Sequence, residues 1–486
     1  DVTIRGQGSG RLGFSETATG LYRDGIYNSG GGFGGRALSR LDLFDAARVE
    51  VLRGPQGALF GRNAVGGAIN IISNTPDDEF GVRGVVRYAD PERTDLEAIL
   101  NLPLHDTLRV RIGGFSSEQD DGFITDTTTG LPIDTQSSAG GRLVTEVTPT
   151  SRETFALIVE HLDTEAPSFT SLGRNPILDP LPYERTNQNR NGVAETSQNA
   201  LTLKADFDLG WADLGLRAAH VEREGQRTNE DGDHFAGITL TDVVAGAGVG
   251  FPDYASSQSE TYSRQVYQAI LTSRQSGRFS WLIGAELLNS DDDVVTEPLD
   301  CPAYTGTLQA TVPGCNVGTS GVLTGASLTA RTVGRRQMNH DTFAEEVESA
   351  SIFASVDADL SEKWTLGAEL RVQHDTRDYA FQRYSEDPLV YFGSGAVPAG
   401  LSAPLGGSGV NTTQFCPPTL AASACAPGNE TAQVASKTEN TFYTPTLTLR
   451  WNFADEQNLY WRFSTGYRSG GFNTNLPPTT IRSALA

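Results

Sequence analysis

From about Gly81 onward, apolar and polar residues alternate with a period of two, which is the pattern of a β-strand with one apolar face. In the segment 201–209, leucine, alanine and phenylalanine fall on one face, and threonine, lysine and aspartate fall on the other. The segments 364–373 and 446–453 repeat this arrangement. We therefore expect about thirteen strands, near 82–89, 94–103, 108–118, 139–148, 152–163, 197–209, 211–223, 259–273, 278–290, 343–360, 363–379, 438–453 and 458–467.

The connections between these expected strands alternate between short and long. Tight turns alternate with long segments, which lie at about 119–138, 164–196, 224–258, 291–342 and 380–437. Since an antiparallel meander brings every second connection to the same end of the sheet, the pattern predicts short turns at one end and long loops at the other. Aromatic residues at strand ends, such as Trp364, Trp451 and Tyr467, fit the interfacial girdle of a membrane barrel. The sequence favours an all-β transmembrane barrel over a soluble β-sandwich, whose turns would be mixed in length.

Composition and charge narrow the class further. The 486 residues carry 37 basic and 60 acidic side chains, a formal net charge of −23. This acidity argues against nucleic acid as a partner, because phosphate contacts need clustered cations. No stretch approaches the roughly 18 uninterrupted apolar residues of a membrane helix, whereas a membrane-spanning strand needs only about 9–11 residues.

The four cysteines form two local pairs in polar segments rich in Gly, Pro, Thr and Ser. Cys301 and Cys315 form one pair, and Cys416 and Cys425 form the other. Neither pair has the spacing of a zinc site. An even count in polar loops predicts two short-range disulfides and an oxidising compartment. Four free thiols are the alternative.

Residues 1–78 are rich in glycine and carry specific motifs. They read VTIRGQGSG at 2–10, GLYRDGIYNS at 20–29 and DLFDAARVEVLRGPQGALFGRNAVGGAINIISNTP at 42–76. This segment resembles the plug domain of TonB-dependent outer-membrane receptors. A second segment, TENTFYTPTLTLRWNFADEQNLYWRFSTGYRSGGFN at 438–473, resembles the mid-barrel signature of the siderophore-receptor branch of that family.

The resemblance implies a barrel with an N-terminal α+β plug domain inside its lumen. The barrels of such transporters have about 22 strands and a plugged lumen, and the family's plug is preceded by a TonB box. We therefore expect a chain that is incomplete at both ends, with the C-terminal part of the plug at 1–78 and the N-terminal part of the barrel at 79–486. The implied location is the outer membrane of a Gram-negative bacterium.

Two groups of candidate site residues follow from the plug resemblance. We expect Glu50, Arg53 and Arg62 to lock the plug to the polar barrel wall, with substrate contact as the alternative. Two glycine-rich turns, at 9–16 and 27–36, carry residues suited to an anionic, aromatic metal chelate through stacking and charge. These residues are Arg11, Phe14, Tyr27, Phe33 and Arg36. Ordinary filling of the loops is an equally weighted alternative for them.

The implied function is uptake of a scarce, bulky solute, most simply a ferric siderophore. The implied partners are the TonB–ExbB–ExbD complex, reached through a segment before Asp1, and outer-membrane lipid or lipopolysaccharide around a monomer. Oligosaccharide, cobalamin, haem or a plant aromatic compound are alternative solutes, and a passive porin or adhesin is the alternative class. No catalytic residues, resident cofactor or enzyme activity are expected, because the glycine-rich stretches lack the P-loop pattern and no G-x-S-x-G motif occurs.

Two groups of possible metal ligands remain open. The acidic runs at 229–234 and 291–293 fall in expected loops and could hold Ca²⁺, although solvated loops are the plainer interpretation. His161, His220 and His374 fall near the outer ends of expected strands, where a haem or metal ligand is conceivable.

Overall fold

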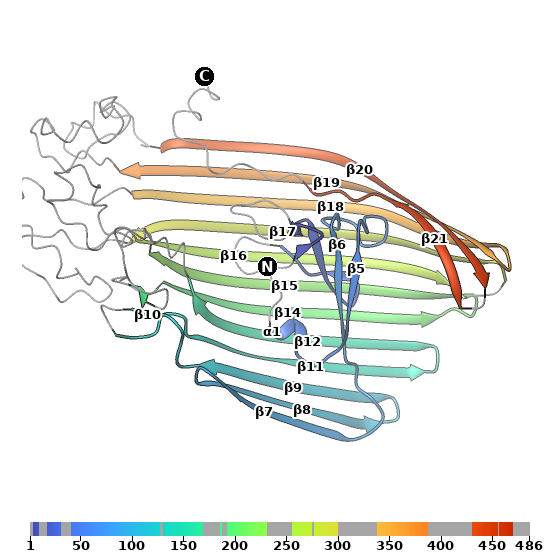
Figure 1. The fold of residues 1–486 in the computed structure, drawn as a ribbon, viewed down its shortest axis with the longest axis horizontal. Coiled ribbons are helices and arrows are strands. Elements are labelled where there is room, and N and C mark those ends of the chain that lie inside the picture. Colours follow the sequence, from blue (N-terminus) through green and yellow to red (C-terminus); the bar gives the residue numbers. More distant parts are fainter. Residues whose placement is uncertain are drawn as a thin grey trace, which may run out of the picture.

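A single antiparallel sheet forms most of the protein, as shown in Figure 1. The computed structural model describes residues 3–8, 17–30, 40–126, 130–168, 185–186, 192–230, 255–274, 277–299, 338–386, 430–454 and 456–469. Thirteen strands pair in sequential order, each with the strands before and after it in the chain. They are β7 (Gly81–Ala89), β8 (Arg93–His105), β9 (Leu108–Gln119), β11 (Gln136–Thr150), β12 (Glu153–Pro167), β14 (Val193–Asp208), β15 (Ala212–Glu230), β16 (Ala255–Ser273), β17 (Phe279–Leu299), β18 (Met338–Ser361), β19 (Trp364–Glu386), β20 (Glu430–Ala454) and β21 (Gln457–Ser464).

The expected meander is confirmed, and most strands run further than expected at the end with long connections. We expected β17 to stop near residue 290, but it continues to Leu299. Asp291–Asp293, which we expected in a loop, therefore lie within a paired strand. The alternation fades there because polar residues occupy both faces, while the backbone pairing that defines a strand needs no apolar side chain. Two short strands, β10 (Thr125–Asp126) and β13 (Arg185–Thr186), pair in parallel at this long-connection end.

The alternation places apolar side chains on the outer face of this sheet and polar ones on the inner face. Leu203 is 50% exposed and Leu370 is 46% exposed, whereas Arg371 and Gln373 are 1% exposed. Trp364 stacks on Trp451 beside the short turns, with ring centroids 5.6 Å apart. Such an apolar band ending in tryptophans is the outer surface of a barrel wall in lipid. Among the described residues, no helix is long and apolar enough to cross a membrane.

Tyr467 does not belong to this aromatic girdle, contrary to our expectation. The chain leaves the sheet after Ser464, and Tyr467 is only 9% exposed. Its carbonyl accepts a hydrogen bond from the Asn63 amide at 3.2 Å, and its hydroxyl donates to Asp375 at 3.4 Å. The segment 465–469 therefore turns inward and packs against the N-terminal part of the chain.

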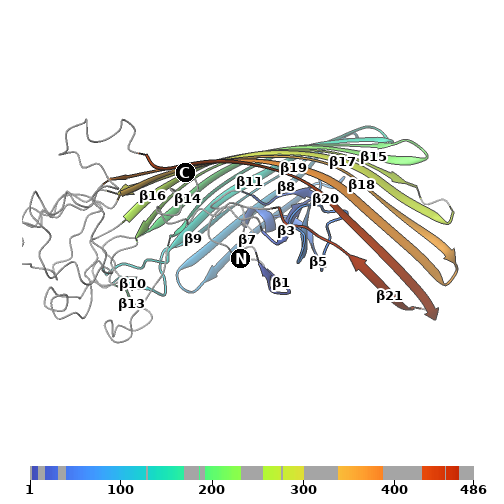
Figure 2. The ribbon, with the colours of Figure 1, turned by 90° about the horizontal axis from the view of Figure 1, so that it is seen from above.

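That N-terminal part is a small separate unit on the concave face of the wall, as Figures 1 and 2 show. Four strands form one mixed sheet in the order β4–β3–β6–β5. The elements are β1 (Thr3–Ile4), β2 (Gln7–Gly8), β3 (Thr19–Arg23), β4 (Ile26–Tyr27), the short helix α1 (Arg40–Leu43), β5 (Ala46–Arg53) and β6 (Gly67–Ser73). We call this unit the plug and the 13-stranded sheet the wall.

Candidate functional site

The interface between plug and wall is built from inward-facing charged side chains. Arg23 of β3 donates to both carboxylate oxygens of Glu160 on β12, at 2.6 and 2.7 Å. Arg142 on the neighbouring strand β11 donates to Glu160 as well, at 2.6 Å. Glu160 is only 5% exposed. One wall carboxylate thus pairs with an arginine from the plug and with an arginine from the wall.

Two further ion pairs join plug and wall nearer the short turns. Lys204 of β14 donates to Asp24 at 2.6 Å, and Arg111 of β9 binds Asp45 through two hydrogen bonds of 2.6 Å. Burial raises the pKa of Asp24, but the charge and hydrogen bond of Lys204 and the Ser73 amide outweigh it, so the pKa lies below its ordinary value. Asp24 is therefore ionised at neutral pH and remains paired.

Wall arginines also hold the two ends of the segment 31–39. On its N-terminal side, Arg264 donates to the Ser29 carbonyl at 3.0 Å, and Arg223 donates to the Gly30 carbonyl at 3.2 Å. On its C-terminal side, Arg142 donates to the carbonyls of Leu41 and Phe44 at 3.1 and 2.9 Å. These hydrogen bonds end on main-chain carbonyls of the plug, and Arg264 also donates to the side-chain oxygen of Asn28 at 3.0 Å.

The GPQGALFGRN motif packs against the β17–β20 part of the wall. A Cβ atom on Gly61 would lie 2.6 Å from the Arg371 guanidinium, so glycine permits the close approach there. Arg371 pairs with Glu286 and donates to the Leu59 carbonyl at 3.4 Å. Gly61 also has a φ of +83°, a backbone conformation that favours glycine, so the backbone and the close contact both suit glycine at this position.

The predicted plug–wall residues occupy different environments. Glu50 accepts hydrogen bonds from Arg48 at 2.8 Å and Asn70 at 3.0 Å, both within the plug. These hydrogen bonds lower the pKa of Glu50. Arg53 is exposed. Arg62 is 3% exposed and lies over the Tyr27 ring, 5.7 Å from its centroid.

Of the predicted substrate residues, only Tyr27 lies among the described residues. It is 3% exposed, and its hydroxyl accepts a hydrogen bond from Asn63 at 2.8 Å. Arg11, Phe14, Phe33 and Arg36 lie outside the described residues, as do Cys301, Cys315, Cys416 and Cys425. Their substrate contacts and the two disulfides stay predictions.

The wall residues that hold the plug are absent from our sequence-based predictions. Alternation does assign Lys204 and Arg371 to the polar face, and both are inward. The alternation does not indicate at which height the plug sits in the lumen. Only residues at that height, such as Glu160 and Arg264, meet the plug.

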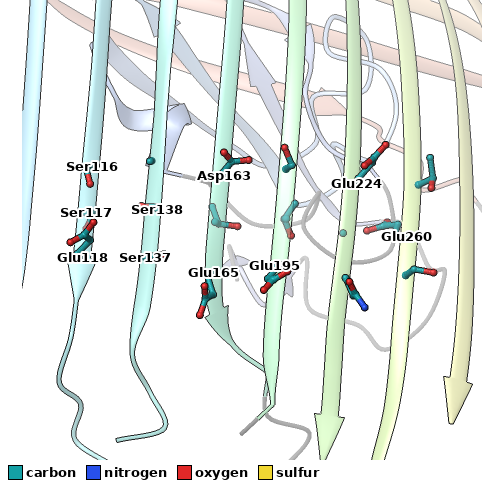
Figure 3. A pocket seen from close by; sticks show the side chains of 18 residues that line it. Ser116, Ser117, Glu118, Ser137, Ser138, Asp163, Glu165, Glu195, Glu224 and Glu260 are labelled. Carbon is teal, nitrogen blue, oxygen red and sulfur yellow. The ribbon is translucent and has the colours of Figure 1, made fainter. Parts of the chain in front are cut away.

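The outer face of the wall becomes acidic toward the long connections. A hollow of about 590 Å³ lies there, and Figure 3 shows the side chains that line it. Glu118, Asp163, Glu165, Glu195 and Glu224 line it. Glu165 and Glu195 pair directly across neighbouring strands, and this face is opposite to the buried inner residues of β12. The acidic zone lies beyond the apolar band and so faces water or lipid headgroups.

The three histidines also lie on this outer face and not in the lumen. His161 contacts Asn199 and Asp163, each at 2.9 Å, and is 51% exposed at its side chain. His220 contacts Glu222 at 3.0 Å, and His374 contacts Thr441 at 3.0 Å. Among the described residues, no group of three or more His, Cys, Asp and Glu side chains converges on a possible metal position. Strand alternation turns these three side chains outward, so none of them faces the lumen.

Comparison with known proteins agrees with this architecture. Residues 1–68 match the TonB-dependent receptor plug domain, and residues 114–484 match the TonB-dependent receptor-like β-barrel. The pesticin receptor of Yersinia pestis is 37% identical over 90 residues, which are 18% of this chain and 13% of that protein. The catecholate siderophore receptor Fiu of Escherichia coli K12 is 38% identical over 68 residues, 14% of this chain and 8% of that protein.

Solved structures of other proteins share the fold. The ferric yersiniabactin uptake receptor of Yersinia pestis aligns with a TM-score of 0.65 at 16% identity, covering 96% of this chain and 58% of that one. The open form of the ferric-catecholate import receptor Fiu of Escherichia coli K12 aligns with a TM-score of 0.63 at 14% identity, covering 94% and 64%. The chain spans less than two thirds of the length of these relatives. Since the barrel family matches more than half of the chain and the plug family matches its start, the chain belongs to the TonB-dependent receptors.

Proposed function

We propose that the protein takes up a ferric siderophore across the outer membrane of a Gram-negative bacterium. The relatives named above support this solute class. They include a catecholate siderophore receptor, a ferric yersiniabactin uptake receptor and a pesticin receptor. The observation that carries the proposal is the polar plug–wall interface, in which Glu160, Lys204 and Arg111 each pair with the plug. Water can replace such contacts, so the plug can loosen without exposing a large apolar surface.

TonB, with ExbB and ExbD, is the energy source in this proposal. A pull on the plug would break the ion pairs that keep it seated. Solute binding at the outer side would precede that pull, with Phe33 and Arg36 as contacts. Lipopolysaccharide would surround the wall at the level where its outer face changes from apolar to acidic.

The test is transport of radioactive iron by a strain that lacks the gene and carries it on a plasmid. Ferric complexes of a catecholate, a hydroxamate and citrate are supplied separately, with and without TonB. We expect uptake of one complex, lost without TonB while surface binding persists. Uptake that persists without TonB would contradict energised transport, and uptake of no ferric complex would redirect the solute class to oligosaccharide, cobalamin, haem or plant aromatics.

A pair of plug variants sharpens this test. Arg36→Ala should weaken surface binding of the transported complex. Arg48→Ala is the matched control, because Arg48 is 62% exposed at its side chain and pairs with Glu50 of its own strand. Equal binding by both variants would remove Arg36 from the proposed contact.

A further inference from the structure

The pairing between β20 and β21 ends at a proline, and the chain leaves the sheet there. The Thr465 amide still donates to the Pro445 carbonyl at 3.2 Å, and the Thr465 hydroxyl donates to the same carbonyl at 3.0 Å. Proline has no backbone N–H, so it cannot return the hydrogen bond that an antiparallel pair would exchange at this position. Among the described residues, no register pair follows Thr446–Ser464. The sequence itself thus favours release of the segment 465–469, which we call the strap.

The strap binds the plug at Asn63, which is fully buried. The Asn63 amide donates to the Tyr467 carbonyl at 3.2 Å, and the Ser469 amide donates to the side-chain oxygen of Asn63 at 3.3 Å. The side-chain nitrogen of Asn63 donates to the Tyr27 hydroxyl at 2.8 Å. Strap and plug therefore satisfy each other's buried polar groups, and neither can move away without leaving the other incomplete.

Two glycines let the strap and the plug approach this closely. A Cβ atom on Gly57 of the plug would lie 2.9 Å from the Thr465 carbonyl oxygen. A Cβ atom on Gly466 of the strap would lie 3.0 Å from the Ala64 carbonyl oxygen. Main chain thus packs on main chain along the plug motif at 57–66, where any larger residue would push the strap away.

The other side of the strap is held by a buried carboxylate of the wall. Asp375 on β19 is 3% exposed. One of its oxygens accepts hydrogen bonds from the hydroxyls of Tyr467 at 3.4 Å and Ser469 at 3.3 Å. The other oxygen accepts from Ser349 at 2.7 Å and Gln373 at 2.9 Å, both in the wall. Because a buried carboxylate is costly without its hydrogen bonds, Asp375 favours the inward position of the strap.

We propose that the strap ties the plug motif at 57–66 to the wall, so that motif and strap open as one unit, separately from the α1 side of the plug. The α1 side is held by other groups, namely the apolar packing of Leu41 and Phe44 and the hydrogen bonds of Arg142. The two hydroxyl bonds to Asp375 are the contacts that release of the strap must break. The inference concerns how the plug is held, and it does not depend on the solute or on energised uptake.

The test is hydrogen–deuterium exchange of the complete, purified receptor, without TonB and without solute. The variant Tyr467→Phe/Ser469→Ala removes both strap hydroxyls that bind Asp375, while the aromatic ring and the backbone hydrogen bonds remain. Ser349→Ala is the matched control, because it removes a hydroxyl bond to the same carboxylate from the wall side.

We expect the peptides covering 57–66 and 465–469 to exchange roughly tenfold faster in the double variant, because two hydrogen bonds to a buried carboxylate are lost. The peptide covering 40–46 should keep its wild-type rate, and Ser349→Ala should leave all three peptides unchanged. Unchanged exchange at 57–66 would overturn the inference. So would equal acceleration at 40–46, because the plug would then loosen as one body, or an equal effect of Ser349→Ala. Loss of the proposed uptake would leave this prediction standing, and the reverse also holds.

A cross-link between strap and wall gives a reversible form of the test. Tyr467 stacks on Phe442 of β20, with ring centroids 4.0 Å apart. Phe442→Cys/Tyr467→Cys, in a background whose four native cysteines are serine, is joined by a short, reducible bifunctional thiol reagent. Exchange at 57–66 should be fast before cross-linking, slow after it and fast again after reduction. Fast exchange in the cross-linked protein would mean that the strap does not hold the motif.

Discussion

Replacing Arg142 with methionine should release one edge of the plug while the wall stays intact. The guanidinium donates three hydrogen bonds, to the Leu41 and Phe44 carbonyls and to Glu160. Glu160 keeps Arg23 as its partner, so the loss falls on two buried carbonyls. Each orphaned carbonyl costs about 1–3 kcal/mol, which together speed local opening roughly 30-fold or more.

Native-state hydrogen exchange measures this opening directly. The peptide covering 40–46 should exchange roughly 30-fold faster in Arg142→Met, and the peptide covering 67–73 in the middle of the plug sheet should not change. Arg142→Lys is the control, since lysine keeps the charge beside Glu160 but lacks the forked geometry that reaches two carbonyls. Unchanged exchange at 40–46, or equal acceleration at 67–73, would refute the idea that this arginine holds α1 locally.

Three further predictions concern the plug and the lipid face. Because the pKa of Asp24 is lowered in the folded protein, its pair with Lys204 stabilises the plug fully above about pH 4, and this stabilisation is lost as pH falls through the lowered pKa. The melting temperatures of wild type and Asp24→Asn should therefore differ at pH 7 and converge in acid. Gly30→Ala should lower the melting temperature of the plug, because the φ of Gly30 is +143° and a Cβ atom there would overlap the Tyr262 hydroxyl. Adding Tyr262→Phe should restore only part of the lost melting temperature. Full restoration would argue against backbone strain at this position. Leu203→Arg should cost about 2–4 kcal/mol in the lipid band and reduce heat-modifiable folded barrel on gels, with no loss meaning that this face is not in lipid.

The sequence predicted the wall well because the wall obeys a local rule. A strand in a barrel faces lipid on one side and the lumen on the other, so the polarity of each residue indicates the face on which it lies. Lys204 between Leu203 and Ala205 can be assigned inward without any knowledge of the fold. The rule fails where both sides are wet, which is why the end of β17 at Leu299 lies nine residues beyond our expectation of residue 290.

The plug–wall contacts could not be predicted in the same way. The Arg142 contacts join residues about a hundred positions apart in the sequence, and they end on carbonyls that every residue possesses. Motif recognition pointed to Arg53 and Arg62, whose contacts with the wall stay predictions. It did not point to Glu160, or to Arg23, although Arg23 lies within the motif at 20–29. A pairing that depends on the depth of the plug in the lumen is set by the assembled structure alone.

The two kinds of contact imply an order of release. Arg142 and Arg223 bind plug carbonyls while each also pairs with a wall carboxylate, Glu160 and Glu260. When the plug backbone moves away, these arginines remain neutralised, and water can satisfy the carbonyls. Lys204 and Arg111 bind plug carboxylates directly, so parting there separates opposite charges. The contacts at Ser29, Gly30, Leu41 and Phe44 should therefore part at a lower cost than the Asp24–Lys204 and Asp45–Arg111 ion pairs nearer the short turns.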